Sequence, residues 1–228
     1  MIATTLAYPS AAELNSAMSK VYVYMMTAVL NTMLVGYMVS TSPELMQVLF
    51  GTGLKWVVLL APLALAIAIP FVIDRVDRTS AILLLHAFAA LMGLSLSVIF
   101  KVYSGTSIVT AFMGAAVLFG TMSLYGYFTG RSLETLGQYL FVALIAVVLA
   151  SIINIFIGSS VMQMIISALA IVIFMGLTAY DTQTIRETLS RNEPGNAAVM
   201  GALTLYLDFI NIFVNLLQLF GGSSTKSD

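Results

Sequence analysis

The sequence predicts an all-α membrane protein with seven transmembrane helices. Of its 228 residues, 60% are hydrophobic and only 8% are charged, whereas average soluble domains carry about 25% charged residues. The mean hydropathy is +1.02. Seven apolar runs are each long enough to cross a bilayer, which takes about 20 residues in a helix. We therefore expect one helical bundle, a single transmembrane domain over residues 21–220 that is embedded in the lipid bilayer.

The seven runs are separated by short polar breaks. They cover residues 21–39, 55–73, 80–100, 107–128, 136–157, 161–185 and 198–220. We expect residues 1–20 to form a tail before the first helix and residues 221–228 to form a short tail after the last. The sixth helix should continue beyond the bilayer to about Arg191. Residues 1–20 lack the basic start and short apolar stretch of a cleaved signal peptide, so the first run is expected to remain as an anchor.

The positive charges predict an orientation in the membrane. Six of them lie on the side of the N-terminal tail: Lys20, Arg75, Arg78, Arg131, Arg186 and Arg191. Three lie on the other side: Lys55, Lys101 and Lys226. Because cytoplasmic segments carry an excess of lysine and arginine, we expect a cytoplasmic N-terminus and, after seven crossings, an external C-terminus.

Composition excludes several classes of protein. The net charge of −1 suggests no nucleic-acid partner. The chain has no cysteine, which excludes disulfides, thiolate metal sites and a cysteine nucleophile. The seventh run contains no lysine that could form a Schiff base with retinal. The sequence predicts no organic cofactor.

The most informative residues are two aspartates in the last two runs. Asp208 lies inside an apolar stretch, where a carboxylate costs several kcal/mol unless a partner compensates it, and such residues usually mark functional sites. Residues 193–196 predict a turn; Asp181 lies 13 residues before Pro194 and Asp208 lies 14 residues after it. Two antiparallel helices joined there would place both carboxylates at one depth, about 15–20 Å from the turn.

The membrane restricts the ionisation of two neighbouring carboxyl groups. They cannot easily both ionise, so we expect the pair to share a proton or to hold a cation. Asp181 and Asp208 are therefore the candidate ligands of a metal cation inside the membrane.

A polar stripe follows one face of the seventh run. It consists of Thr204, Asp208, Asn211, Asn215 and Gln218. At 100° per residue these positions fall within a wedge of about 80°. Since such a face cannot point at lipid, we predict that the seventh helix is central and wrapped by the other six. For Asn215 and Gln218, a structural role in hydrogen bonds between helices is as good an interpretation as a functional role.

Other polar and small residues have plainer interpretations. Arg75, at the end of the second run, is either a topology charge or a counter-ion that reaches the aspartate pair. His86, the single histidine, is more simply a neutral residue bonded inside the bundle than a proton acceptor. Asn154 is expected to join helices by hydrogen bonds, and the glycines of the fourth run let helices approach closely.

The segments around the aspartates resemble those of a known family. Ala-Tyr-Asp-Thr-Gln at 179–183 and Leu-Thr-Leu-Tyr-Leu-Asp-Phe-Ile-Asn at 203–211 look like signature segments of the Bax inhibitor-1 family. Thr-Met-Ser-Leu-Tyr-Gly-Tyr at 121–127 looks like its bacterial YccA/YbhL-type branch. The resemblance covers nearly all seven runs and is strongest from about residue 105 onward.

The resemblance implies a six-helix bundle around a central seventh helix and a pH-sensitive calcium leak across the membrane. It places the family's proton-sharing sensor at Asp181 and Asp208 and its gating arginine at Arg75. Asp74 and Asp77 dilute the basic cluster around that arginine. Residues 223–228 lack the lysine-rich tail of eukaryotic relatives, which indicates a protein of the bacterial inner membrane.

Two other functions remain open. One is a regulator that binds and modulates a membrane-anchored ATP-dependent protease without transport, using residues 1–20 as the contact. The other is an intramembrane aspartyl protease, in which two aspartates also share a proton. The segment before Asp208 lacks the glycines of those proteases, and no Pro-Ala-Leu segment follows. We therefore expect no enzymatic activity, and the leading hypothesis is a calcium leak that closes as the pH falls.

Overall fold

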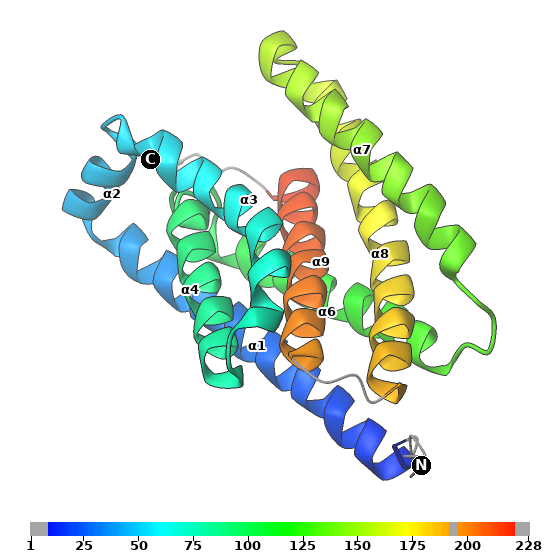
Figure 1. Cartoon of the computed structure of the whole chain (residues 1–228). Coiled ribbons are helices and arrows are strands. Elements are labelled where there is room, and N and C mark those ends of the chain that lie inside the picture. Colours follow the sequence, from blue (N-terminus) through cyan, green and yellow to red (C-terminus); the bar gives the residue numbers. More distant parts are fainter. Residues whose placement is uncertain (1–8, 192–195, 222–228) are drawn as a thin grey trace, which may run out of the picture.

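The computed structural model describes residues 9–191 and 196–221. Among them, seven helices are long and apolar enough to cross a membrane, which confirms the predicted fold class. These are α1 (Ala11–Thr41), α3 (Leu54–Val72), α4 (Arg78–Leu96), α6 (Gly105–Phe128), α7 (Glu134–Ile157), α8 (Ser160–Ser190) and α9 (Ala197–Phe220). The short elements are α2 (Pro43–Phe50), the 3-10 turn η1 (Ile73–Arg75) and α5 (Ile99–Val102). Helix α1 begins and α9 ends at opposite ends of the bundle, as an odd number of crossings requires (Figure 1).

The first helix starts ten residues earlier than the sequence indicated. Ser10 and Glu13 form a capping box: the Glu13 carboxylate accepts from the Ser10 backbone N–H at 2.8 Å, and the Ser10 hydroxyl accepts from the Glu13 N–H at 3.3 Å. Such reciprocal caps start a helix even in polar sequence. Residues 11–20 of the expected tail are therefore helical, while residues 1–8 and 222–228 of the two tails lie outside the described part.

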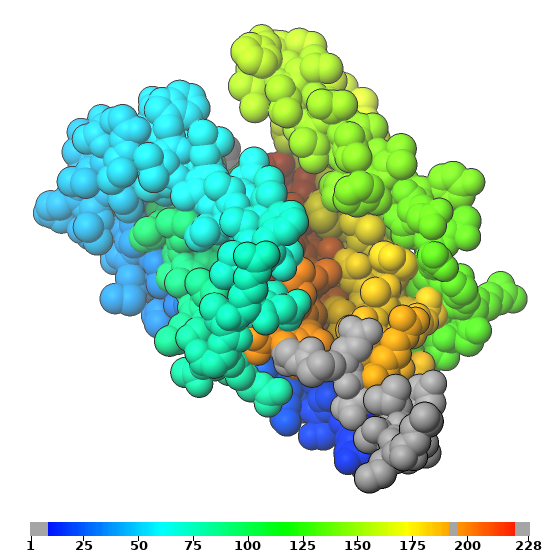
Figure 2. All heavy atoms as spheres, in the orientation of Figure 1, coloured from blue at the N-terminus to red at the C-terminus, as the bar shows by residue number. Residues whose placement is uncertain are grey.

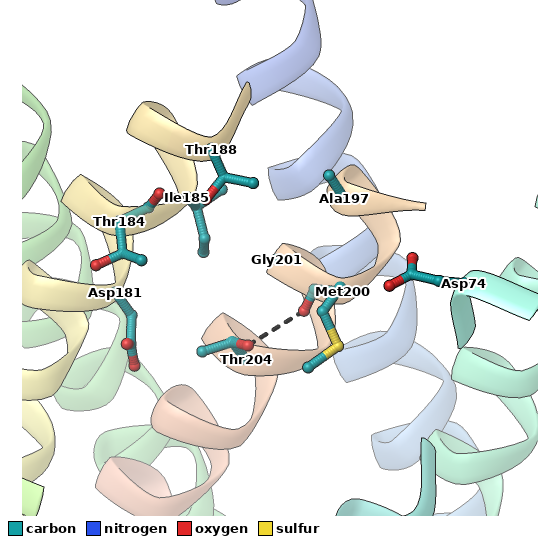
Figure 3. Close-up of a pocket in the computed structure, with 9 residues that line it drawn as sticks. All are labelled: Asp74, Asp181, Thr184, Ile185, Thr188, Ala197, Met200, Gly201 and Thr204. Atoms are coloured by element: carbon teal, nitrogen blue, oxygen red, sulfur yellow. Dashed lines mark hydrogen bonds between the residues drawn. The ribbon is translucent and has the colours of Figure 1, made fainter. Parts of the chain in front are cut away.

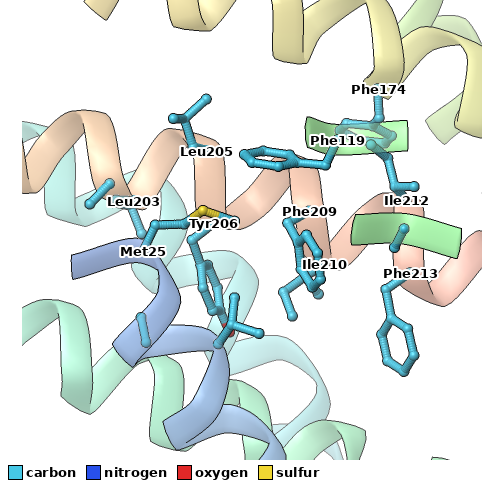
Figure 4. Packing of buried hydrophobic residues seen from close by; sticks show 14 of the residues in the cluster. Met25, Phe119, Phe174, Leu203, Leu205, Tyr206, Phe209, Ile210, Ile212 and Phe213 are labelled. Carbon is cyan, nitrogen blue, oxygen red and sulfur yellow. The ribbon is translucent and has the colours of Figure 1, made fainter. Parts of the chain in front are cut away.

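An aromatic face of α9 forms the centre of the bundle (Figure 4). Tyr206 is fully buried, and its ring packs edge-on against Phe88 of α4 with centroids 5.7 Å apart. Its hydroxyl lies 2.7 Å from the Thr32 hydroxyl of α1. Phe209 packs edge-on against Phe119 of α6 at 5.7 Å. These contacts join α9 to three other helices through one side of its surface.

The prediction that six helices wrap α9 is not confirmed. Helix α9 is the most buried of the long helices and packs on α1, α4, α6 and α8. Helix α3 packs on α4, and α7 packs on α8. Figure 2 shows α3 and α7 standing apart on either side of a hollow, with α8 and α9 visible inside it. The bundle is thus open on the side that faces α3 and α7.

Helices α6 and α8 approach each other backbone to backbone. A Cβ atom on Gly126 would overlap the carbonyl group of Ala179, so only glycine fits at this crossing. The close packing expected from the glycines of α6 is therefore confirmed at Gly126. A Cβ on Gly120 or Gly130 would meet open space, so these two glycines serve no such contact.

A tight turn joins α7 to α8. Gly158 has a φ of 70°, the left-handed conformation that glycine adopts without strain at a helix end. The buried Asn154 side chain donates to the Ser159 carbonyl oxygen at 3.2 Å and to Oε1 of Gln163 at 3.3 Å. Asn154 therefore bonds two helices together, as predicted.

Candidate functional site

Asp208 is a carboxyl group buried in the middle of the bundle. It lies halfway along α9, and the residue is only 3% exposed. Its Oδ2 atom is buried and has no hydrogen-bond partner among the described residues. Because buried polar atoms are almost always satisfied, this oxygen requires a proton, a water molecule or a cation.

Asp181 on α8 supplies the neighbouring carboxyl group. The two side chains lie within hydrogen-bonding range of each other. Thr178, one turn earlier on α8, also faces Asp208, but its hydroxyl donates to the Phe174 carbonyl oxygen at 2.7 Å. The structure thus brings together the two aspartates that the sequence placed at one depth. A proton held between them would satisfy the unpartnered oxygen.

A cavity of about 250 Å³ leads to Asp181 from the end of the bundle where α8 stops and α9 starts. We call this cavity the vestibule. It is lined by Asp74, Asp181, Thr184, Ile185, Thr188, Ala197, Met200, Gly201 and Thr204. Figure 3 shows Asp181 and Asp74 on opposite sides of it, with Met200 and Thr204 between them. The vestibule therefore carries a carboxylate on two of its walls.

A larger cavity of about 730 Å³ lies between α3 and α7, and we call it the lateral groove. Its walls include Leu63 and Ala66 of α3 and Phe141, Leu144 and Val148 of α7. Its floor includes Phe174, Asp181, Thr204, Asp208 and Asn211. Asp181 and Thr204 line both cavities, so the aspartate pair lies where the vestibule and the lateral groove meet.

Three residues of the polar stripe of α9, Thr204, Asp208 and Asn211, line these cavities, and the stripe bonds mostly to its own helix. Thr204 donates to the Met200 carbonyl oxygen at 3.2 Å. Asn211 and Asn215 each donate to the carbonyl oxygen four residues back, at 2.8 Å. Gln218 crosses to α8; its Oε1 accepts from Gln163 at 2.9 Å and from Ser167 at 3.0 Å. The interpretation as a bond between helices is confirmed for Gln218, whereas the hydrogen bond that Asn215 makes among the described residues stays within α9.

Arg75 lies apart from the aspartate pair in this structure. It is exposed at the end of η1 and lines neither cavity. Its neighbour Asp74 is the residue of this corner that faces the vestibule. The gating role of Arg75 stays a prediction, because contact with the pair would require the corner between α3 and α4 to move.

Asn196, which the sequence analysis did not single out, fastens that corner to the start of α9. The side chain is buried, and its Nδ2 donates to the carbonyl oxygens of Ile73 at 2.7 Å and Val76 at 3.0 Å. These two carbonyls flank Asp74 and Arg75. The only available signal was an asparagine at the end of the predicted turn, whose other residues, 193–195, lie outside the described part.

Gln183 fixes the neighbouring turn of α8. Its Oε1 accepts from the Leu133 backbone N–H at 2.8 Å, and its Nε2 donates to the Arg131 carbonyl oxygen at 2.9 Å. The link between α6 and α7 is thereby bound to α8 two residues after Asp181. This bond positions the aspartate without touching it.

His86 takes no part in the site. Its Nδ1 lies 3.0 Å from the Ile82 carbonyl oxygen on the same helix, and the residue lines neither cavity. Its own carbonyl accepts from Asn31 of α1 at 2.8 Å. The interpretation of His86 as a residue bonded inside the bundle is confirmed.

The described residues include no group of three or more histidine, cysteine or acidic side chains that could hold a metal ion. Calcium takes about 6–8 oxygen ligands. Asp181 and Asp208 could supply carboxylate oxygens and Thr204 a hydroxyl, so water would have to complete the shell. The donor set fits a cation held briefly better than one bound tightly.

The fold and the site together define a seven-helix membrane protein with a carboxyl pair between its last two helices. A family model described as "Inhibitor of apoptosis-promoting Bax1" matches residues 14–225. The chain therefore belongs to the Bax inhibitor-1 family, as its motifs around Asp181 and Asp208 indicated.

Bacterial relatives match over most of the chain. The Escherichia coli inner membrane protein YbhL is 39% identical over 217 residues, which cover 92% of this chain and 93% of that protein. An uncharacterized protein of Rickettsia prowazekii is 38% identical over 208 residues, covering 90% and 88%. An uncharacterized membrane protein of Streptococcus pyogenes is 42% identical over 150 residues, covering 64% and 66%.

Proposed function

We propose that this protein is a pH-sensitive calcium leak of the bacterial inner membrane, gated by Asp181 and Asp208. The observation that carries the proposal is the buried carboxyl group of Asp208 beside that of Asp181, which lines a vestibule inside a membrane bundle. A side chain that only forms a hydrogen bond between two helices does not need to be ionisable, whereas a proton sensor does. The similarity to YbhL, an inner membrane protein, supports the location.

The proposed gate works through a single proton. At low pH the pair shares a proton, which satisfies Oδ2 of Asp208 and closes the path. When that proton leaves, two adjacent negative charges repel each other and attract a divalent cation. Calcium flux should therefore fall as the pH falls through the range in which the pair takes up its proton.

The vestibule is the proposed route by which calcium reaches the pair. Asp74 and Asp181 lie on opposite sides of it, so a cation that enters the vestibule has a carboxylate on each side. Arg75 follows Asp74 at the same corner and is proposed as the counter-ion that closes this route when the corner moves inward. The positive-inside rule would place the vestibule on the cytoplasmic side, with the N-terminus.

The test is calcium uptake by proteoliposomes loaded with an indicator dye, between about pH 6 and about pH 8, where a buried carboxyl pair can titrate. Asp181→Asn and Asp208→Asn should each remove the pH dependence that the native chain shows. Glu187→Gln, an exposed carboxylate on α8 outside both cavities, is the matched control and should keep it. A pH response retained in Asp208→Asn would refute the gate. Absence of flux at every pH would favour the regulator of a membrane-anchored protease.

A further inference from the structure

We propose that the lateral groove is a binding site for one acyl chain of a bilayer lipid. The groove has a volume of about 730 Å³ and opens sideways between α3 and α7 (Figure 2). Leu63 on one wall and Phe141 on the other are largely exposed, so the groove is continuous with the surface that faces lipid. At this level of the bilayer the surrounding solvent is hydrocarbon.

The floor of the groove favours an apolar ligand over water. Thr204 and Asn211 are neutral polar residues of the floor on α9. Each donates one hydrogen bond to a carbonyl oxygen of its own helix. The carboxyl groups of Asp181 and Asp208 are also part of the floor and lie within hydrogen-bonding range of each other. A water molecule in a cavity needs about 2–4 polar partners. The two hydrogen bonds within α9 leave fewer donors free for water, and most of the lining of the groove is apolar, which favours hydrocarbon over water.

The walls of the groove are largely apolar, and Gln138 of α7 is their one polar residue among those that line the groove. Leu63 and Ala66 come from α3, and Phe141, Leu144 and Val148 come from α7. Each wall packs on a different neighbour, α3 on α4 and α7 on α8, so no helix of the described part fills the space between them. An acyl chain could lie there in contact with carbon atoms along both sides.

The size of the groove excludes a helix as its occupant. A transmembrane helix is about 10–12 Å across and about 30 Å long, so its volume is roughly three to five times that of the groove. One hydrocarbon chain is narrow enough to enter between the walls. A second copy of this protein could cover the mouth of the groove but could not fill it.

The proposal stands independently of calcium transport. If the calcium leak is also correct, the acyl chain seals the side of the aspartate pair that faces lipid, and ions reach the pair only through the vestibule.

Quenching of tryptophan fluorescence by brominated phospholipids tests this site directly. Trp56 is the single tryptophan of the chain, so Trp56→Phe gives a background without tryptophan. Into it we place Phe174→Trp on the floor of the groove, where the residue is buried among protein atoms. Val172→Trp, two residues away on the outer face of α8, is the control for full contact with lipid. Phe213→Trp, in the core against α6, is the control for no contact.

The proposal predicts that lipids brominated in mid-chain quench Phe174→Trp nearly as strongly as Val172→Trp, and several-fold more than Phe213→Trp. Leu144→Trp on the α7 wall repeats the measurement in case Phe174→Trp does not fold. Red-shifted emission that is quenched by iodide would mean a water-filled groove and would overturn the proposal. Quenching no greater than that of Phe213→Trp would mean that protein closes the groove, which would overturn it as well.

Discussion

The two halves of this bundle are built differently. In the most apolar window of α9, 61% of the residues are buried, compared with 11% in α7 and 22% in α3. Helix α9 packs on four long helices, whereas α7 packs on α8 and α3 on α4. The carboxyl pair lies in the densely packed half, at the floor of the lateral groove between α3 and α7.

This difference assigns separate tasks to the two halves. The buried half holds Asp181 and Asp208 in fixed positions, because α8 and α9 are locked to α1 and α6 along much of their length. Helices with few neighbours are the ones that move at low cost in free energy. We therefore expect the opening step to displace α3 and the η1 corner rather than α8 or α9.

The largest effect should come from spoiling the close packing of the buried half. Gly126→Ala would drive a methyl group into the backbone of Ala179, which has no room to yield. We expect a loss of about 3 kcal/mol or more in the free energy of unfolding. Denaturant titration in detergent measures it, with Gly120→Ala on the same helix as the control, since that methyl group meets open space. Equal stability of the two variants would contradict the account of the α6–α8 crossing.

A smaller effect should follow from releasing the corner that joins the two halves. Asn196→Ala removes two hydrogen bonds and leaves the carbonyls of Ile73 and Val76 unpaired. The expected loss is about 1–2 kcal/mol in the free energy of unfolding, because unsatisfied buried groups are costly. Asn215→Ala, which loses a single bond within its own helix, should cost less than about 0.5 kcal/mol by the same titration. If Asn215→Ala is the more damaging change, Asn196 does not fasten the corner.

The smallest effect concerns the charge at the vestibule. Asp74→Asn should lower calcium flux about threefold at low ionic strength, because the vestibule loses one of its two carboxylates. Salt screens charges at the surface, so the difference should vanish at high ionic strength.

Asp77→Asn is the matched control for the charge at Asp74. The hydrogen bond from the Ser80 hydroxyl lowers the pKa of Asp77, so its carboxylate remains charged across the pH range of the flux assay. Asp77 lies at the same corner but lines neither cavity, and asparagine can still cap α4 in its place. Equal losses of flux in Asp74→Asn and Asp77→Asn would mean that the general surface charge matters, and not the vestibule.

Much of this architecture is readable from the sequence because lipid imposes a strong rule on it. Every spanning segment must be apolar and helical, so seven runs gave seven helices. The juxtaposition of Asp181 and Asp208 followed from their nearly equal separations, 13 and 14 residues, from Pro194 in the predicted turn. Helix α1 was misjudged at its start, because the Ser10–Glu13 cap extends the helix into polar sequence.

Contacts between distant segments could not be predicted in this way. The polar stripe indicated a helix shielded from lipid. In the structure, Asn211 and Asn215 form hydrogen bonds within α9, and the bundle is open between α3 and α7. The role of Asn196 depends on the carbonyl groups of a corner 120 residues earlier in the chain. Asp74 lines the vestibule and Arg75 does not. This depends on the direction in which η1 turns, which the periodicity of the sequence does not reveal.

The most direct measurement asks whether Asp181 and Asp208 share a proton. Infrared difference spectra of the reconstituted protein, taken between about pH 6 and about pH 8, report protonated carboxyl groups buried in the bundle. The account predicts a band of a protonated carboxyl group that is present at the lower pH, declines at the higher pH and is absent from Asp208→Asn, while Glu187→Gln keeps it. A band that persists in Asp208→Asn, or no protonated carboxyl group in the native protein at the lower pH, would contradict the account.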